Sequence, residues 1–358
     1  MEYKKLSIKN IFANLFIYGT THALIDFICG AVLFSIFTNK IIVDLTEFTS
    51  LVILYSVLAF GLQVFLGIFS DYLKSPRATA FLGCMFTGAS AFMFLNFPIL
   101  AVVFAGIGNA LFHVGGGSIS LNLTPKKVTA PGIYVAPGAI GLFFGVLIGK
   151  AGQFIVWPFI LALIILCILM FVIKKPEMNY IKEKINKNKI NYFELILILI
   201  FLSIAIRSLV GTVMVFPWKA NIDLAIILTI AIVLGKGLGG ILADKFGWIR
   251  IGVGALALSI PFLVFGANIP LIAIIGMFLF NITMPITLVA ISNILLGRPG
   301  FAFGITCLAL IIGAFPTFNF GIKNILSGQI FIFLIIIISV TALYFGLKAY
   351  KNYFEKVN

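Results

Sequence analysis

Long apolar runs, separated by short polar connections, follow one another along the whole chain. Each run is roughly 20 residues long, the length that an α-helix needs to cross a bilayer core of about 30 Å. Read in this way, the sequence predicts helices over residues 11–37, 48–70, 78–96, 98–120, 130–149, 153–173, 192–216, 222–243, 250–267, 269–292, 301–320 and 325–347. The expected fold class is therefore an all-α polytopic membrane protein with twelve transmembrane helices.

The composition leads to the same class. The 358 residues are 62% hydrophobic and 10% charged, and the mean hydropathy is +1.19, values that soluble domains do not reach. All four cysteines lie within apolar runs and none belongs to a C-x-x-C pair, so they imply no disulfide framework. We expect no cofactor and no resident metal.

The net charge of +14 is explained by topology. If the N-terminus is cytoplasmic, Arg207 and Lys236 lie within helices, and nineteen of the other Lys and Arg residues (25 − 2 − 4) lie on cytoplasmic segments. The four on the opposite side are Lys40, Lys150, Lys219 and Lys323. Because cytoplasmic loops of membrane proteins carry an excess of positive residues, both termini are expected in the cytoplasm of a multi-pass protein of the inner or plasma membrane. Nucleic-acid binding is disfavoured.

A polar segment divides the chain into two halves. The longest such segment is "KKPEMNYIKEKINKNK" at 174–189. It predicts an N-terminal six-helix bundle over 1–173, a basic cytoplasmic linker over 174–190 and a C-terminal six-helix bundle over 191–358. The other connections are only a few residues long, which is too short to bury a hydrophobic core of their own.

The two halves carry matching residues at equivalent topological positions. Three residues recur 173 positions later and three others recur 172 positions later. The pairs are Gly67 and Gly240, Asp71 and Asp244, Arg77 and Arg250, Asn109 and Asn281, Lys126 and Arg298, and Gly132 and Gly304. The common order and the nearly constant offset indicate two parallel repeats that both enter the membrane from the cytoplasm.

Twelve helices in two sets of six, a basic central loop and a G-x-x-x-D…R motif after the second and eighth helices resemble the major facilitator superfamily. The motif reads "GIFSDYLKSPR" at 67–77, without the usual glycine after the aspartate, and "GILADKFGWIR" at 240–250. In addition, "GNALFHVGGGS" at 108–118 is similar to the fosmidomycin-resistance-like branch. The resemblance implies a secondary transporter that works by alternating access, and not an enzyme.

The resemblance also implies that the two loop motifs control gating. Asp71 and Asp244 fall at cytoplasmic helix ends, where a carboxylate can pair with loop cations or helix N-terminal amides and hold one conformation until the halves rock. Without a gating role, they would only anchor helix ends. The residues expected in these gating loops are Gly67, Asp71, Arg77, Gly240, Asp244 and Arg250.

Few ionisable residues lie well inside the expected helices, and two of them share a face of the first helix. In "THALIDFICG" (21–30), His22 and Asp26 are four residues apart, and Cys29 follows on the same face. An intramembrane carboxylate can carry protons, and histidine titrates near physiological pH. We therefore expect Asp26 and His22 to provide proton coupling. The alternative for Asp26 is a structural ion pair with Arg207.

Six other polar residues within the expected helices are candidates for substrate binding: Arg207, His113, Asn109, Lys236, its repeat counterpart Gln63, and Asn281. An arginine in the middle of a membrane helix needs a carboxylate, water or an anionic ligand beside it. With neutral histidines, the formal charges of Asp26, Arg207 and Lys236 sum to +1, which favours an anionic solute.

The sequence thus predicts a secondary active transporter of a small anionic solute, coupled to protons and acting as a monomer in the lipid bilayer. A carrier of transition-metal ions, with His22, Asp26, Cys29 and His113 as ligands, stays open, as does a drug efflux carrier. A membrane channel or a membrane-embedded enzyme is disfavoured, because the repeats favour rocking halves and no H-E-x-x-H or G-x-S-x-G motif is present. The chain also lacks the G-x-x-x-x-G-K-[ST] loop of ATP-driven proteins.

Overall fold

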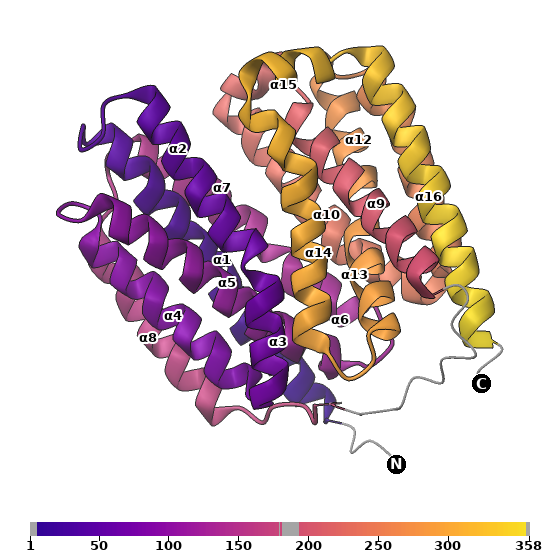
Figure 1. Ribbon diagram of the computed structural model, residues 1–358, viewed down its shortest axis with the longest axis horizontal. Helices are drawn as coiled ribbons and strands as arrows, with labels where there is room; N and C mark the ends of the chain where they lie inside the picture. The colour runs from indigo at the N-terminus through magenta and orange to yellow at the C-terminus, as the bar shows by residue number, and fades with distance from the viewer. Residues whose placement is uncertain (1–5, 179, 181–192, 356–358) are drawn as a thin grey trace. The chain divides into compact units, whose positions relative to one another are not determined.

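The computed structural model describes residues 6–178, 180 and 193–355, and every regular element in these residues is a helix (Figure 1). The first elements along the chain are α1 (Ile8–Thr38), α2 (Leu45–Ser56), η1 (Val57–Gly61), α3 (Gln63–Leu73), α4 (Pro76–Met93), α5 (Pro98–Leu123), α6 (Thr129–Val135), α7 (Pro137–Lys150) and α8 (Val156–Val172). Most of the linker expected over 174–190 lies outside the described residues.

The second half of the sequence is helical in the same way. Its elements are α9 (Phe193–Val213), η3 (Pro217–Ala220), α10 (Ile222–Phe246), η4 (Ile249–Val253), α11 (Gly254–Val264), α12 (Pro270–Asn281), α13 (Thr283–Ile294), α14 (Pro299–Ala314), η5 (Phe315–Phe318), α15 (Phe320–Leu326) and α16 (Gln329–Glu355). Each apolar run of the sequence therefore overlaps a helix, and the all-α class is confirmed.

Nine helical segments of the described residues are long and apolar enough to cross a membrane. They are Ile8–Thr38, Leu45–Leu73, Pro98–Leu123, Thr129–Lys150, Phe193–Val213, Ile222–Phe246, Pro270–Ile294, Pro299–Phe318 and Gln329–Asn352. The helices Val156–Val172 and Ile249–Val264 are apolar but shorter, and α4 covers the remaining expected run. The count of twelve crossings and the cytoplasmic side of the termini stay predictions.

Prolines and capping side chains in the polar connections determine where many helices begin. Proline occupies the first position of α4, α5, α7, α12 and α14, where a helix does not need its missing N–H. Before α1, α2 and α10, the side chains of Ser7, Asp44 and Asn221 accept hydrogen bonds from backbone N–H groups of the first turn. The connections therefore carry the signals that start the next helix.

The chain forms two compact units. The first comprises Met1–Pro125, Ile133–Tyr180 and Gly297–Cys307, and the second comprises Lys126–Gly132, Ile181–Leu296 and Leu308–Asn358. In the first unit, α1 packs along α7 and α5, and α4 packs along α5 and α8 (Figure 1). In the second unit, α9 packs along α16, and α12 packs along α10 and α11. Each unit thus contains a short segment from the opposite half of the sequence.

A close helix contact of the same kind occurs in both units. In the first unit, Gly141 of α7 lies against the carbonyl group of Ala23 in α1. In the second unit, Gly313 of α14 lies against the carbonyl group of Ala205 in α9, and the two glycines are 172 positions apart (313 − 141). A side chain at either position would collide with backbone atoms, so the small residue permits the close approach. The two units therefore share a mode of helix packing.

Substitution of Gly141 tests this packing. We expect Gly141→Leu to lower the melting temperature of the purified protein, because overpacking a tight contact costs about 1–3 kcal/mol. Gly211 in α9 provides the control, since a Cβ there meets no atom within 4 Å. Gly211→Ala should leave the melting temperature unchanged or raise it, because alanine is the better helix former. A Gly141→Leu protein as stable as the wild type would contradict the close approach.

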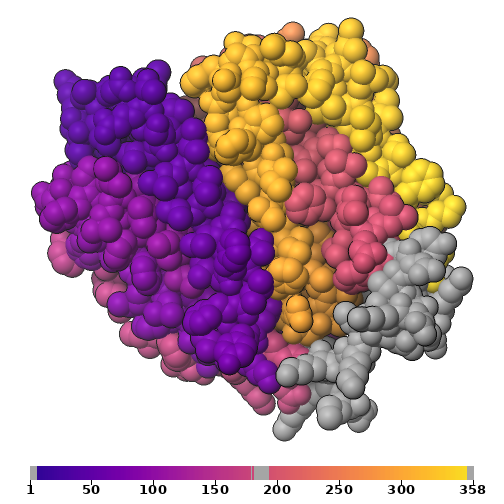
Figure 2. Space-filling model, in the orientation of Figure 1, coloured from indigo at the N-terminus to yellow at the C-terminus, as the bar shows by residue number. Residues whose placement is uncertain are grey.

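Large apolar side chains cover the outward faces of several helices. Figure 2 shows α2 and α3 in indigo and α16 in yellow at the surface of the molecule. Apolar surface of this extent is unfavourable in water and is typical of helices that face lipid. Exposed residues of this kind include Phe65, Ile68 and Phe69 on α3, and Ile330, Leu334 and Ile338 on α16.

Candidate functional site

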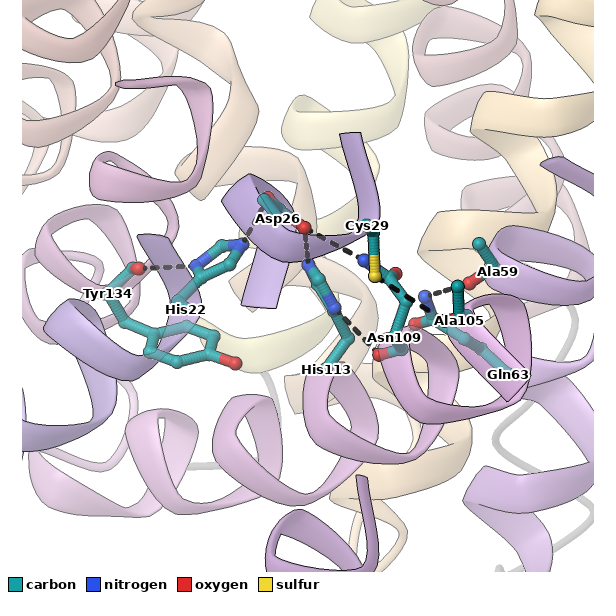
Figure 3. Close-up of polar contacts among 9 residues, drawn as sticks. All are labelled: His22, Asp26, Cys29, Ala59, Gln63, Ala105, Asn109, His113 and Tyr134. Atoms are coloured by element: carbon teal, nitrogen blue, oxygen red, sulfur yellow. Dashed lines mark hydrogen bonds and ion pairs between the residues drawn. The ribbon is translucent and has the colours of Figure 1, made fainter. Parts of the chain in front are cut away.

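A polar cluster in the first unit is built from two helices (Figure 3). His22 and Asp26 lie on α1, and Asn109 and His113 lie on α5. The members of each pair are four positions apart and so share one face of their helix. Packing of α1 along α5 brings the two faces together. His22, Asp26 and His113 form what is named below the His–Asp–His triad.

Asp26 lies at the centre of the triad. Its Oδ2 is 3.3 Å from Nε2 of His22, and its Oδ1 is 3.7 Å from Nε2 of His113. Nδ2 of Asn109 also donates a 2.8 Å hydrogen bond to Oδ1. Both histidines are buried, and Asp26 exposes only 15% of its side chain. The carboxylate therefore has polar partners at both oxygen atoms within an apolar helix.

The other ring nitrogen of each histidine is held by a backbone carbonyl group. Nδ1 of His22 lies 2.9 Å from the carbonyl oxygen of Tyr134, and Nδ1 of His113 lies 2.8 Å from that of Asn109. A carbonyl oxygen can only accept a hydrogen bond, so each Nδ1 carries a hydrogen atom, and Nε2 of a neutral ring directs a lone pair at Asp26. Lone pairs of nitrogen and oxygen thus face one another. Only a proton or another cation between them makes these contacts favourable.

A helix break beside the triad supplies one of these carbonyl groups. α6 ends at Val135 and α7 begins at Pro137, which has no N–H to continue the helical hydrogen bonds. Tyr134, in the last turn before the break, accepts the hydrogen bond of His22. Gly138, directly after the proline, lies very close to the triad. A Cβ at this position would overlap Nε2 of His22. The missing side chain at Gly138 therefore lets the backbone of α7 lie directly against the triad.

Two other polar residues of this unit make separate contacts (Figure 3). Sγ of Cys29 donates a 3.5 Å hydrogen bond to the carbonyl group of Ala105 and lies outside the triad. Nε2 of Gln63 donates a 2.6 Å hydrogen bond to the carbonyl group of Ala59. Oε1 of Gln63 is buried and has no hydrogen-bond partner among the described residues. The substrate-binding role of Gln63 stays a prediction.

In the second unit, Arg207 of α9 is buried beside two threonines of α13. Nη1 donates a 2.6 Å hydrogen bond to Oγ1 of Thr283, and Nη2 donates a 3.4 Å hydrogen bond to Oγ1 of Thr287. Nε has no hydrogen-bond partner in the described part of the chain. No carboxylate among the described residues of this unit lies within ion-pair distance of the guanidinium group. Hydroxyl groups solvate this charge but do not neutralise it.

These two threonines were not predicted from the sequence. Their spacing in "TMPIT" (283–287) does place them on one helix face, which is the signal that could have found them. Asn281 uses Nδ2 for a 2.8 Å hydrogen bond to the carbonyl group of Met277. Lys236 lies in α10, and its carbonyl group contacts Gly132. The substrate-binding role of Asn281 and Lys236 stays a prediction.

Asp71, at the end of α3, binds a helix N-terminus. Its Oδ1 and Oδ2 accept hydrogen bonds from the backbone N–H groups of Gly300 and Phe301, both at 2.9 Å, at the start of α14. Gly67, one turn earlier, lies directly against the backbone of Gly300. The carboxylate thus neutralises the positive end of a helix, which is one of the two kinds of partner expected from the sequence.

Asp244 makes the equivalent contact in the second unit. It accepts hydrogen bonds from the backbone N–H groups of Val128 at 2.9 and 3.0 Å and of Thr129 at 2.9 Å, at the start of α6. Oγ1 of Thr129 adds a hydrogen bond at 2.6 Å, and Gly240 lies against the carbonyl group of Val128. Residues 128 and 300 differ by the repeat offset of 172 (300 − 128). The repeats therefore share their loop contacts as well as their sequence.

Arg77, the arginine of the first loop motif, contacts the C-terminus of a helix, whereas Asp71 and Asp244 contact helix N-termini. Nη2 of Arg77 donates a 2.6 Å hydrogen bond to the carbonyl group of Ile173, directly after α8, and Nη1 reaches that of Phe171 at 3.5 Å. Arg77 therefore caps the C-terminus of α8, where carbonyl groups lack helical partners. Arg250, its repeat counterpart, lies in η4.

Substitution of Asp244 tests the loop contact. We expect Asp244→Ala to lower the free energy of unfolding by about 1.5–3 kcal/mol, because buried N–H groups lose a charged acceptor. Asp223 is the control, since it lies exposed in the first turn of α10, where Asp223→Ala should cost less than about 1 kcal/mol. Thermal unfolding of the purified variants measures the difference. Equal losses for the two variants would contradict the role of Asp244.

Comparison with known proteins shows what the fold is similar to. No protein-family model matches this sequence, and no curated protein matches it. Among solved structures, FucP, a major facilitator superfamily transporter in the outward conformation, aligns with a TM-score of 0.66 and 10% identity over 93% of this chain and 99% of that chain. A variant of the E. coli fucose:proton symporter FucP aligns with a TM-score of 0.64 and 12% identity, covering 92% and 98%.

The human organic anion transporter MFSD10 (TETRAN) aligns equally well, with a TM-score of 0.64 and 11% identity over 93% of this chain and 99% of that chain. Identities at this level show the fold and leave the solute open. The fosmidomycin-resistance-like branch is not tested by these matches. Because the alignments cover nearly the full length of each chain, they show that this protein has the fold of the major facilitator superfamily transporters.

Proposed function

We propose that the protein is a secondary active transporter that moves a small anionic solute across the bilayer by alternating access and couples this movement to protons at the His–Asp–His triad. One observation carries the proposal. On a transporter fold, one unit buries a cluster that needs a cation, and the other buries a guanidinium group that needs an anion. Burying either group lowers the stability of the fold. Polar groups that are buried in a membrane protein at such a cost are typically retained for function.

The anionic solute is inferred from Arg207. A buried guanidinium group with no carboxylate partner among the described residues of its unit attracts carboxylates and phosphates, which it can bind through two parallel hydrogen bonds. Its unused Nε and the hydroxyl groups of Thr283 and Thr287 provide further polar groups for such a ligand. Among the structural neighbours, one is named an organic anion transporter, which agrees with this solute class.

Proton coupling is inferred from the triad. Each Nε2 lone pair faces the carboxylate of Asp26, so a proton taken up there is shared between two acceptors. Loading and release of such a proton changes the charge of the cluster and can bias the conformational equilibrium. A fucose:proton symporter is among the structural neighbours. Asp71 and Asp244 would hold helix N-termini in one conformation and exchange these partners as the transporter switches.

A ligand screen followed by a transport assay tests this proposal. Thermal shifts of the purified protein would be measured with carboxylates, phosphate esters, neutral sugars and organic cations. A ligand at 100 times its Kd stabilises the folded state by about 2.7 kcal/mol, and we expect such shifts only among the anions. The best anion is then tested for counterflow in proteoliposomes, where saturable exchange indicates a carrier. Hits confined to neutral or cationic compounds, or flux that does not saturate, would contradict the proposal.

A further inference from the structure

The triad also has the donor set of a transition-metal site. We infer that His22, Asp26 and His113 bind one divalent transition-metal ion of the zinc type, through Nε2 of each histidine and a carboxylate oxygen. Two imidazoles and a carboxylate suit zinc, cobalt and nickel ions. The inference rests on the geometry of the first unit and does not depend on the proposed transport.

The spacing of the donor atoms fits a tetrahedral ion. Ligand atoms that each lie about 2.0–2.1 Å from a tetrahedral zinc ion are about 3.3 Å from one another. In the structure, Nε2 of His22 is 3.3 Å from Oδ2 of Asp26, and Nε2 of His113 is 3.7 Å from Oδ1. The three ligand atoms all lie within 4.8 Å of one another. Small rotations of the side chains would bring them to metal-binding distance.

The surrounding hydrogen bonds are those of a formed metal site. Histidines that bind metals nearly always donate their second ring N–H to a carbonyl or carboxylate group, which fixes the tautomer and orients the ring. Both histidines do so, to the carbonyl groups of Tyr134 and Asn109. The amide of Asn109 orients the carboxylate in turn. The lone pair of each Nε2 is therefore already directed at the carboxylate of Asp26, that of His22 at Oδ2 and that of His113 at Oδ1.

The three protein donors fill three of the four positions of a tetrahedral ion. Cys29 lies one turn further along α1, donates to the carbonyl group of Ala105 and is absent from the donor set. Gly138 lies directly against His22 and Asp26, where a Cβ would overlap Nε2 of the histidine and Oδ2 of the carboxylate. A divalent ion with one carboxylate and two neutral imidazoles has a net charge of +1. Water or a carboxylate of a small anion can therefore complete the coordination.

Metal binding to the purified protein in detergent, without gradient or solute, tests the inference. We expect the wild-type protein to bind one Zn²⁺ ion, measured by equilibrium dialysis. With Co²⁺ in place of Zn²⁺, it should show the intense visible absorption that is typical of a tetrahedral cobalt ion. Asp26→Asn and His113→Ala should each weaken Zn²⁺ binding at least about tenfold. Cys29→Ser should bind Zn²⁺ like the wild type. Melting temperature and elution volume establish that each variant is folded.

Two results would overturn the inference. One is a folded wild-type protein that takes up no Zn²⁺ by saturable binding. The other is equal Zn²⁺ affinity in the wild type, Asp26→Asn and His113→Ala, which would locate the ion elsewhere. Since no solute or proton gradient is present, either result leaves the transport proposal to be judged by its own assays.

Discussion

Asp26→Asn is expected to abolish pH-driven accumulation of the solute while leaving solute exchange measurable. The amide has the shape of the carboxylate and can accept from Asn109 through its oxygen while donating to the Nε2 lone pair of His22. The fold should therefore be retained. What the variant lacks is an oxygen atom that gains and loses a proton. Uptake in proteoliposomes, with and without an imposed pH gradient, measures the effect.

The control for this substitution is Asp223→Asn, which removes a carboxylate from the exposed start of α10. This variant should accumulate solute as the wild type does. For Asp26→Asn, uptake under a pH gradient should fall to the level seen without the gradient, and counterflow should persist. If Asp26→Asn still accumulates solute in response to the gradient, the triad is not the site of proton coupling.

Arg207→Met is expected to weaken binding of the anionic solute about 100-fold or more, because a charge-assisted pair in an apolar site contributes about 2.7 kcal/mol or more. The same variant should be as stable as the wild type or more stable. Methionine fills similar volume, and the protein no longer buries a charge that no carboxylate of its unit neutralises. Thermal unfolding and ligand-induced shifts, measured on the same preparation, separate the two effects.

Arg77→Met provides the opposite pattern as a control. Arg77 caps the C-terminus of α8, so its loss should lower the melting temperature and leave the affinity for the solute unchanged. An Arg207→Met protein that loses several kcal/mol of stability but keeps its affinity would make Arg207 a structural residue and remove the main support for an anionic solute.

The helical class of this protein can be predicted from hydropathy, because every apolar run must satisfy its backbone hydrogen bonds within a helix. The repeats are also visible in the sequence, since Asp71 and Asp244 and their neighbouring glycines are constrained by the same helix N-terminal contact. The i, i+4 spacing of His22 and Asp26 likewise fixes their common face before any tertiary structure is known.

Other parts of the site depend on packing between helices that a single sequence does not specify. The position of His113 beside Asp26 follows from the way α1 packs along α5, and the carbonyl partner of His22 follows from the break at Pro137. For the same reason helical spacing alone includes Cys29 among the metal ligands, whereas the structure directs its thiol to the carbonyl group of Ala105. Thr283 and Thr287 were missed because hydroxyl groups in a membrane helix usually bond to their own backbone.

The most direct test of the account is proton movement driven by the solute. Proteoliposomes with a pH indicator in the lumen start with no pH gradient, and a potassium ionophore holds the membrane potential at zero. Addition of the anion found in the ligand screen should change the lumenal pH in wild-type vesicles, and not in Asp26→Asn vesicles that still exchange the solute. Solute accumulation with no change of lumenal pH in the wild type would contradict proton-coupled transport by this protein.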